Sequence, residues 1–219
     1  VKYVDLNDVK SKFITYNQEI TSHSTDGNVT LDFSDQNSRQ IKVNSGEVNY
    51  INISYDDLHA DTNTYIEFSD LNNNDILVIN VDMKGQTDAK LHGMILGAKD
   101  SGIANSESNF TKKYNRIFYN IYDSSKSDKQ YEGTLTFGER GFGTVIAPSA
   151  NIIMASNWDG TIIANQFTNG AQYHRVDGTE FPKVSTEPST PSGSESGSTQ
   201  PSTPGGSESG STQPSTPSG

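Results

Sequence analysis

The segment FGTVIAPSANIIMASNWDGTIIANQF, which runs from Phe142 to Phe167, contains nearly the same phrase twice. GTVIAP begins at Gly143 and GTIIAN begins at Gly160, so the copies lie 17 residues apart. Short apolar runs that end in small or polar residues are typical of β-strands. The repeat favours a β-helix, in which each rung buries its apolar face against the next and like residues stack on like residues. An ordinary β-meander with two similar strands is the alternative.

The chain before this repeat is also predicted to be mostly β. Runs of β-branched and aromatic residues are separated throughout by Asn, Asp, Gly and Ser, which favour turns. The predicted fold class is therefore mainly β, a β-helix or β-solenoid-like domain. The predicted strands include NVTLDF, QIKVN, YINISY, TYIEFS, ILVINVDM, KLHGMILGA, RIFYNIY, GTLTF, TVIA, NIIMA and TIIANQF.

One α-helix is predicted near the N-terminus. Apolar residues recur there at intervals of three and four, which is the spacing of one face of a helix. Asp5 comes just before this pattern and can cap the helix with its side chain. The residues of the predicted apolar face are Leu6, Val9, Phe13, Tyr16 and Ile20.

The C-terminal part differs in composition from the rest of the chain. PSTPSGSESGSTQ at 188–200 is followed by PSTPGGSESGSTQ at 201–213, a repeat of 13 residues. Such a sequence cannot bury enough apolar surface to offset the entropy of ordering, so we predict that it is disordered. The predicted division is a β domain at 1–183 and a disordered linker or stalk at 184–219.

Composition restricts the partners and the chemistry. The 219 residues carry a formal net charge of −11 and include no cysteine. An acidic chain repels nucleic acid and anionic membranes, and no apolar run approaches the roughly 20 residues of a membrane helix. Without cysteine, the chain has no disulfide, no Cys-based metal site and no Cys nucleophile. No signal-peptide pattern begins at Val1, so we expect a piece of a longer product.

The β domain resembles a known family in its closing segment. The matching residues in GTVIAPSANIIMASNWDGTIIANQF and YHRVDGTEFP are Gly143, Ala147, Pro148, Ala150, Gly160, Ala164, His174 and Phe181. They resemble the closing motif of the choice-of-anchor A domain of bacterial surface proteins, in its C-terminal portion. The resemblance implies a β domain outside the cell, at the cell surface, that is attached to the cell wall through an anchor missing from this sequence.

Aromatic residues supply the candidate ligand-binding site, which consists of Trp158, Asp159, Tyr119 and Tyr122. Trp158 is the only tryptophan and lies in a predicted turn. An exposed indole ring would be the best single ligand contact, whereas a ring beneath the turn would only pack. Tyr119 and Tyr122 point to opposite faces of a predicted strand, and the outward one is a candidate to stack on a sugar or bind a protein.

The segment DLNNNDILVINVD, which begins at Asp70, partly matches a calcium-binding loop. Asp70, Asn72 and Asn74 match the first, third and fifth positions of a calcium loop. The Gly and Glu expected later in such a loop are replaced by Asp75 and Val81. A hairpin turn is therefore favoured, and a calcium site of another kind that uses these oxygens is the alternative.

No motif indicates catalysis. HExxH and GxSxG do not occur, and the glycine-rich GERGFG is followed by a predicted strand rather than by the helix of a phosphate-binding loop. On a strand, Asp57, His59 and Asp61 would share one face as metal ligands do, but a solvated acidic edge is favoured. The chain is predicted to be no enzyme and, calcium apart, to need no cofactor.

The layout of a folded β domain on a disordered stalk, together with the resemblance to choice-of-anchor A domains, predicts a non-catalytic adhesin or display domain of the bacterial cell surface. It would bind a host extracellular protein or glycan, and the Ser/Thr/Pro-rich stalk would hold it off the cell wall. The alternative is a purely structural spacer or matrix component without a specific ligand. An exposed aromatic patch would favour the adhesin, and a uniformly polar surface would favour the spacer.

Overall fold

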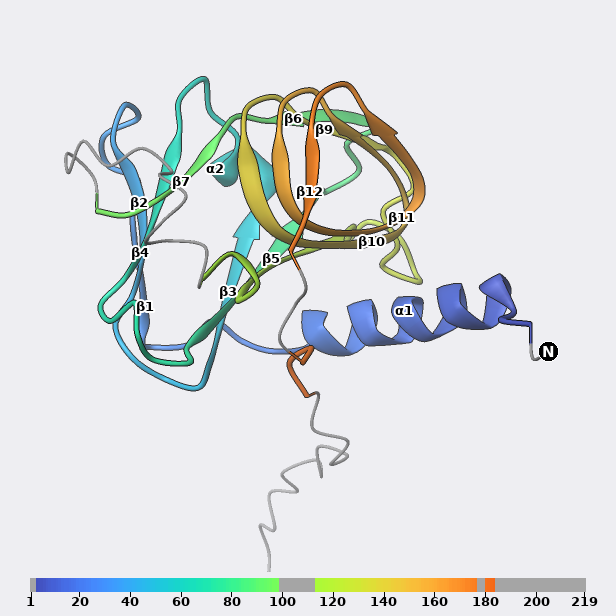
Figure 1. The fold of residues 1–219 in the computed structure, drawn as a ribbon, viewed down its shortest axis with the longest axis horizontal. Coiled ribbons are helices and arrows are strands. Elements are labelled where there is room, and N and C mark those ends of the chain that lie inside the picture. Colours follow the sequence, from blue (N-terminus) through green and yellow to red (C-terminus); the bar gives the residue numbers. More distant parts are fainter. Residues whose placement is uncertain (1–2, 99–112, 177–179, 184–219) are drawn as a thin grey trace, which may run out of the picture. The chain divides into compact units, whose positions relative to one another are not determined.

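In the part of the chain that the structure describes, the fold is mainly β with the helices α1 and α2, and its parallel strands form a curled sheet that resembles half a barrel (Figure 1). The computed structural model describes residues 3–98, 113–176 and 180–183. The repeats at 184–219 lie outside the described residues, so the disordered stalk stays a prediction. No helix within the described ranges is long and apolar enough to cross a membrane.

The larger sheet has eight strands, and its main path runs in the order β12-β11-β10-β8-β5-β3. Every neighbouring pair on this path is parallel. The strands are β3 (Val48–Ser54), β5 (Ile76–Asp82), β8 (Ile117–Tyr122), β10 (Gly141–Met154), β11 (Trp158–Asn169) and β12 (Tyr173–Arg175). A branch of β6 (Asp88–Leu91) and β9 (Thr134–Phe137) joins the end of β10, again in parallel.

The smaller sheet has four strands in the order β1-β2-β4-β7. Its strands are β1 (Val29–Asp32), β2 (Arg39–Val43), β4 (Thr64–Phe68) and β7 (Met94–Leu96). The hairpin of β1 and β2 is antiparallel, whereas β2, β4 and β7 run parallel to one another. Apolar side chains from both sheets meet in one buried core, so the two sheets close around a shared interior.

The predicted strands are confirmed, with two differences in how they are divided. KLHGMILGA forms two strands, β6 and β7, rather than one. TVIA and NIIMA belong to the single strand β10, whose register against β11 shifts between Ala147 and Asn151. Pro148 lies in this interval and has no N–H to donate to a neighbouring strand. The pairing is therefore irregular at Pro148, but β10 continues beyond it.

The two copies of the repeated phrase lie side by side in β10 and β11, and like residues are paired. Gly143 is opposite Gly160, Thr144 is opposite Thr161, and the alignment continues through Ala147 and Ala164. A side chain at Gly160 would collide with the carbonyl oxygen of Gly143 and with the indole nitrogen of Trp158. The repeated glycine is therefore explained by the close approach of the two strands around Trp158, and the predicted stacking of like residues is confirmed.

The N-terminal helix is confirmed as α1 (Leu6–Thr21), and the Asp5 side chain accepts a hydrogen bond from the backbone N–H of Asn7. The predicted apolar face is only partly buried, because Leu6 is 77% exposed while Ile20 is fully buried. The C-terminal half of α1 packs on β8 and β10, where Ile20 joins Phe118 and Ile146 in a second apolar cluster. One face of the parallel sheet is thus covered by the helix.

A row of asparagines fixes α1 to the sheet. Asn52, Asn80 and Asn120 occupy paired positions on β3, β5 and β8. Asn80 donates to Asn52 over 2.8 Å, and Asn120 donates to Asn80 over 2.9 Å. Asn17 of α1 extends the row by donating to Asn120 over 2.8 Å, and Gln130 donates in turn to Asn17. Asn52 is the exposed end of the row, and the other amides are buried and satisfy one another, so the polar row costs little to bury.

The prediction of a single helix is wrong, because YINISY ends in a second, one-turn helix. This helix, α2, covers Tyr55–Leu58 and is capped by the Ser54 side chain. The run from Asp56 to Asp61 therefore lies in α2 and the bend after it rather than on a strand. Asp57, His59 and Asp61 are not brought to one strand face, which removes the geometry on which their metal-site interpretation depended.

Candidate functional site

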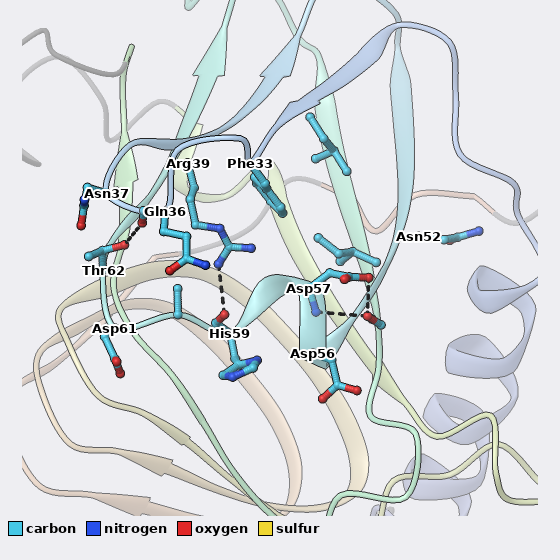
Figure 2. Close-up of a pocket in the computed structure, with 14 residues that line it drawn as sticks. Phe33, Gln36, Asn37, Arg39, Asn52, Asp56, Asp57, His59, Asp61 and Thr62 are labelled. Atoms are coloured by element: carbon cyan, nitrogen blue, oxygen red, sulfur yellow. Dashed lines mark hydrogen bonds between the residues drawn. The ribbon is translucent and has the colours of Figure 1, made fainter.

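A groove of about 830 Å³ lies between the turn that follows β1 and the segment that contains α2 (Figure 2). One wall comes from the end of β1 and the start of β2, and the other comes from β3, α2 and the bend after them. Its lining residues are Leu31, Phe33, Gln36, Asn37, Arg39, Asn52, Ile53, Ser54, Asp56, Asp57, His59, Ala60, Asp61 and Thr62.

Arg39 forms a fixed part of the groove wall. The residue is 4% exposed, and its guanidinium donates hydrogen bonds to the carbonyl oxygens of Leu58 (2.6 Å) and His59 (3.2 Å). The guanidinium carbon also lies 4.0 Å from the centre of the Phe33 ring. Burial lowers the pKa of Arg39, and the nearby Asp57 carboxylate opposes that shift. Arg39 thus joins the β2 side of the groove to the α2 side.

Carboxylates face the groove from α2 and the bend after it. Ser54 and Asp57 cap the helix reciprocally, since the Ser54 hydroxyl accepts from the Asp57 backbone N–H (3.1 Å) and donates to its carboxylate (2.5 Å). Acidic residues are favoured at this first helical turn. Asp56, Asp57 and Asp61 are all exposed, so three carboxylates line the groove against the single cation of Arg39.

The groove is held open by contacts within its own walls. The Thr62 hydroxyl donates to the backbone oxygen of Gln36 and thereby joins the two sides at one end (Figure 2). The His59 ring stacks on Tyr55 with a centroid distance of 5.0 Å. These contacts place the polar side chains before any ligand arrives, which lowers the entropic cost of binding.

The chemistry of the lining suits ligands with many hydroxyl groups. Carboxylates accept hydrogen bonds from hydroxyls, and the amides of Gln36, Asn37 and Asn52 both donate and accept. Leu31 is exposed and Phe33 is half-buried, so apolar surface lies beside these polar groups. In the described part of the chain, no group of three or more His, Cys, Asp or Glu residues could hold a metal ion. The arrangement can therefore bind and orient a polar ligand.

The structure brings two of the predicted ligand-binding residues together, but it places them in the interior. Trp158 is 1% exposed, and its ring lies 4.7 Å from that of Phe137 and 5.9 Å from that of Tyr119. The indole N–H donates to the carbonyl oxygen of Gly143 over 3.0 Å. The Trp158 ring was expected either to be exposed for ligand contact or to pack beneath the turn, and the structure shows it packed in the interior. Tyr119 is fully buried as well, because its strand β8 is covered on both faces.

The other two predicted residues, Asp159 and Tyr122, do not line the groove either. Asp159 is buried, accepts a hydrogen bond from Arg140 (3.1 Å) and lies 2.6 Å from the Nδ1 atom of His174. Tyr122 is half-buried at the end of β8, and burial, with the nearby Asp82, raises the pKa of its hydroxyl. Asp159 therefore connects β11 to β12, a contact between elements of the fold.

The predicted calcium loop lies between β4 and β5, where it contacts two cations of the protein itself. Asp70 accepts from the backbone N–H of Asn72 over 2.8 Å, as in a tight turn. The side-chain oxygen of Asn74 accepts from Arg116 over 3.0 Å, and Lys113 donates to the neighbouring Asn73. The predicted hairpin turn is wrong, because β4 and β5 belong to different sheets and do not pair. A calcium ion at Asp70, Asn72 and Asn74 stays a prediction and would have to displace Arg116.

Most groove residues were not predicted as a site from the sequence. Asp57, His59 and Asp61 stood out, but their partners Phe33 and Arg39 come about 20 positions earlier, with no spacing that links the two segments. The asparagine row did leave a signal. An apolar-Asn-apolar triplet recurs around Asn52, Asn80 and Asn120 in three predicted strands.

With its preformed polar groove on a curled β scaffold, the domain has the character of a binding module. Comparison with protein families supports that class: the model described as "Putative Ice-binding-like adhesive domain" matches residues 1–175. The chain belongs to this family of adhesive domains. Comparison with curated proteins and with solved structures finds no significant match to either. The match supports an adhesin-like role, while the description of the family differs from choice-of-anchor A.

Proposed function

We propose that this protein is a non-catalytic adhesive domain of a bacterial cell surface, and that its groove binds a glycan. The observation that carries the proposal is the groove itself, which an adhesive-family domain presents fully formed. Residues 184–219 would act as the stalk that holds the domain off the cell wall. A host extracellular protein with a basic segment is the other class of ligand that three exposed carboxylates would suit.

The mixture of carboxylates, amides and apolar side chains in the groove favours a glycan as the ligand. Asp56 and Asp61 offer exposed carboxylates, and Asn37 offers an amide. These side chains can form hydrogen bonds with neighbouring hydroxyl groups of one sugar. The exposed Leu31 and the half-buried Phe33 provide apolar surface for the C–H face of a sugar ring. A groove open to solvent also admits an internal segment of a longer polysaccharide.

We further propose that the parallel strands form a short β-helix. Strands β3, β5, β8, β10, β11 and β12 follow one another in chain order and in the sheet, each parallel to the next. The in-register pairing of Gly143 with Gly160 and of Asn80 with Asn120 is the arrangement that successive rungs produce. The likeness of the closing segment to choice-of-anchor A domains is consistent with this architecture.

The test is binding of the full 219-residue chain to a glycan panel and to host matrix proteins. The double variant Asp56→Asn, Asp61→Asn keeps the shape of the groove and removes two charges. Glu132→Gln removes an exposed charge outside the groove and serves as the control. We expect saturable glycan binding that the double variant weakens at least tenfold and the control leaves unchanged.

Two other outcomes would redirect the proposal. Binding to a matrix protein that weakens steeply with added salt would identify a basic protein as the ligand, because screening acts on charge pairs between exposed groups. If the correctly folded chain bound none of the glycans or matrix proteins, the structural spacer would be favoured.

A further inference from the structure

A buried lysine lies against an asparagine side chain where the β4–β5 loop meets the segment before β8. Lys113 is 1% exposed, and its ammonium nitrogen lies 2.8 Å from the side-chain oxygen of Asn73. The same nitrogen lies 3.0 Å from the backbone oxygen of Asn73. Lysine is almost never fully buried unless it is paired with an acid, and among the described residues the hydrogen-bond acceptors of Lys113 are the two neutral oxygens of Asn73.

The amide of Asn73 is held at both of its ends by Asp75. The backbone N–H of Asp75 donates to the side-chain oxygen of Asn73 over 3.1 Å. The side-chain nitrogen of Asn73 donates to the carboxylate of Asp75 over 2.5 Å, and Asp75 is itself buried. The first contact polarises the carbonyl group, and the second places a proton carrier beside the amide nitrogen.

Burial favours the neutral, nucleophilic form of Lys113. Its nitrogen lies 4.6 Å from the centre of the Phe68 ring, a cation–π contact that acts in the opposite direction. Burial lowers the pKa of Lys113, an effect that Asp75 and Asp70 oppose and that Arg116 reinforces. Desolvation is a general means of turning a lysine into a nucleophile near neutral pH.

We propose that Lys113 and Asn73 form an intramolecular amide cross-link, with Asp75 carrying the proton. The neutral amine of Lys113 attacks the side-chain carbonyl carbon of Asn73, and a new N–C bond forms. Asp75 takes a proton from the attacking nitrogen and delivers it to the amide nitrogen of Asn73. The bond from the carbonyl carbon to that nitrogen then breaks and ammonia leaves. The reaction needs no oxidant, metal or other reactant.

The cross-link would join segments that are 40 residues apart in the chain. It would tie the loop before β5 to the segment before β8, and these two strands are neighbours in the sheet. A chain without cysteine has no disulfide available for this purpose. The amide also differs from a disulfide because reducing agents do not break it. The proposed cross-link does not depend on the groove or its ligand. The cross-link proposal and the glycan-binding proposal can therefore fail separately.

The first test is the intact mass of the purified full chain, measured after denaturation. We expect a mass below that of the sequence by one molecule of ammonia. Because a cyclic imide at another asparagine would lose the same ammonia, a protease digest must then be fragmented. The digest should contain one branched peptide in which the segment with Asn73 is joined to the segment with Lys113. A folded wild-type chain with the full sequence mass would overturn the proposal.

Variants assign the roles of the three residues. Lys113→Arg and Asn73→Ala should each restore the full mass, while Asp75→Asn should slow the reaction so that uncross-linked folded chain accumulates. Asn73→Asp should instead lose one molecule of water, since a carboxyl group replaces the amide. Asn72→Ala and Lys126→Arg, at exposed positions, are controls and should keep the deficit. A deficit that persists in Lys113→Arg would contradict the assignment.

Discussion

The indole N–H of Trp158 donates to the carbonyl oxygen of Gly143 over 3.0 Å, and this bond joins the first copy of the repeated phrase to the start of the strand that carries the second copy. Trp158 opens β11, and Gly143 lies opposite Gly160 in the neighbouring strand. The bond requires the two strands to approach closely at both glycines. The repeat is thus a packing feature of the interior, and the only tryptophan serves the fold.

Gly160→Ala is therefore expected to destabilise the domain. A methyl group at this position would meet the carbonyl oxygen of Gly143, which belongs to the backbone and cannot move aside without shifting β10. Overpacking of this kind costs about 3 kcal/mol. Chemical unfolding measures the loss, and Gly27→Ala is the matched control because an added carbon there meets nothing within 4 Å. Equal unfolding midpoints for the two variants would contradict the packing argument.

Asn80→Ala should also be costly, since Asn80 is the middle member of the asparagine row. The substitution removes its bonds to Asn52 and to the backbone oxygen of Ile20, and it takes an acceptor from Asn120. Leaving buried polar groups unsatisfied costs about 2–3 kcal/mol. Asn165→Ala, at an exposed position that accepts from Lys10, should change the free energy of unfolding far less. A similar loss in both variants would mean that the row is not a stabilising unit.

Tyr119→Phe is expected to leave stability at neutral pH unchanged or to increase it. The Tyr119 hydroxyl is buried and has no hydrogen-bond partner among the described residues, so the phenylalanine ring removes an unsatisfied group. Tyr131→Phe is the comparison, because its hydroxyl donates to the backbone oxygen of Thr134 over 2.9 Å. That variant should lose about 1 kcal/mol. Thermal unfolding of both variants measures the difference. A larger loss of stability in Tyr119→Phe than in Tyr131→Phe would contradict the prediction.

Stability should fall as the pH rises above about 10, the ordinary pKa of tyrosine. Burial raises the pKa of Tyr119 in the folded state, so the unfolded chain releases its proton at a lower pH than the folded chain does. The stability linked to this group is complete below the unfolded pKa and is lost as the pH rises through the interval up to the folded value. Urea unfolding from pH 8 to pH 11 follows this effect, and Tyr119→Phe should show a shallower decline than the wild type. If stability declined equally with pH in the wild type and in Tyr119→Phe, the loss of stability at alkaline pH would be due to other groups.

Removal of the proposed cross-link should lower thermal stability without changing the fold. Constraining a loop of 40 residues contributes about 4 kcal/mol by the chain-entropy estimate, which corresponds to a fall in Tm of about 10 °C for Lys113→Arg. Calorimetry of the cross-linked wild type and the variant gives the difference, and circular dichroism checks that the β content is kept. The same Tm in both proteins would show that the cross-link, where present, does not stabilise the domain.

Much of the fold could be predicted because it rests on local patterns. The spacing of apolar residues predicted α1, the cap at Asp5 was confirmed, and the strands followed from their composition. The one-turn helix α2 was missed, since four residues are too few for a helical period to be recognised. Leu6 was placed on a buried face and is exposed, because the spacing describes a helix face but not how far the sheet beneath it extends.

The sequence by itself determined the mainly β class, the N-terminal helix, the pairing of the two glycine-threonine phrases and the lack of any disulfide. Only the tertiary structure decided that Trp158 is buried, that Arg39 reaches the α2 side of the groove, and that Lys113 lies against Asn73. The physical reason is range. Strand and helix patterns follow from neighbours a few residues apart, whereas these contacts join residues 15 to 40 positions apart that meet only after strand register and loop paths are fixed.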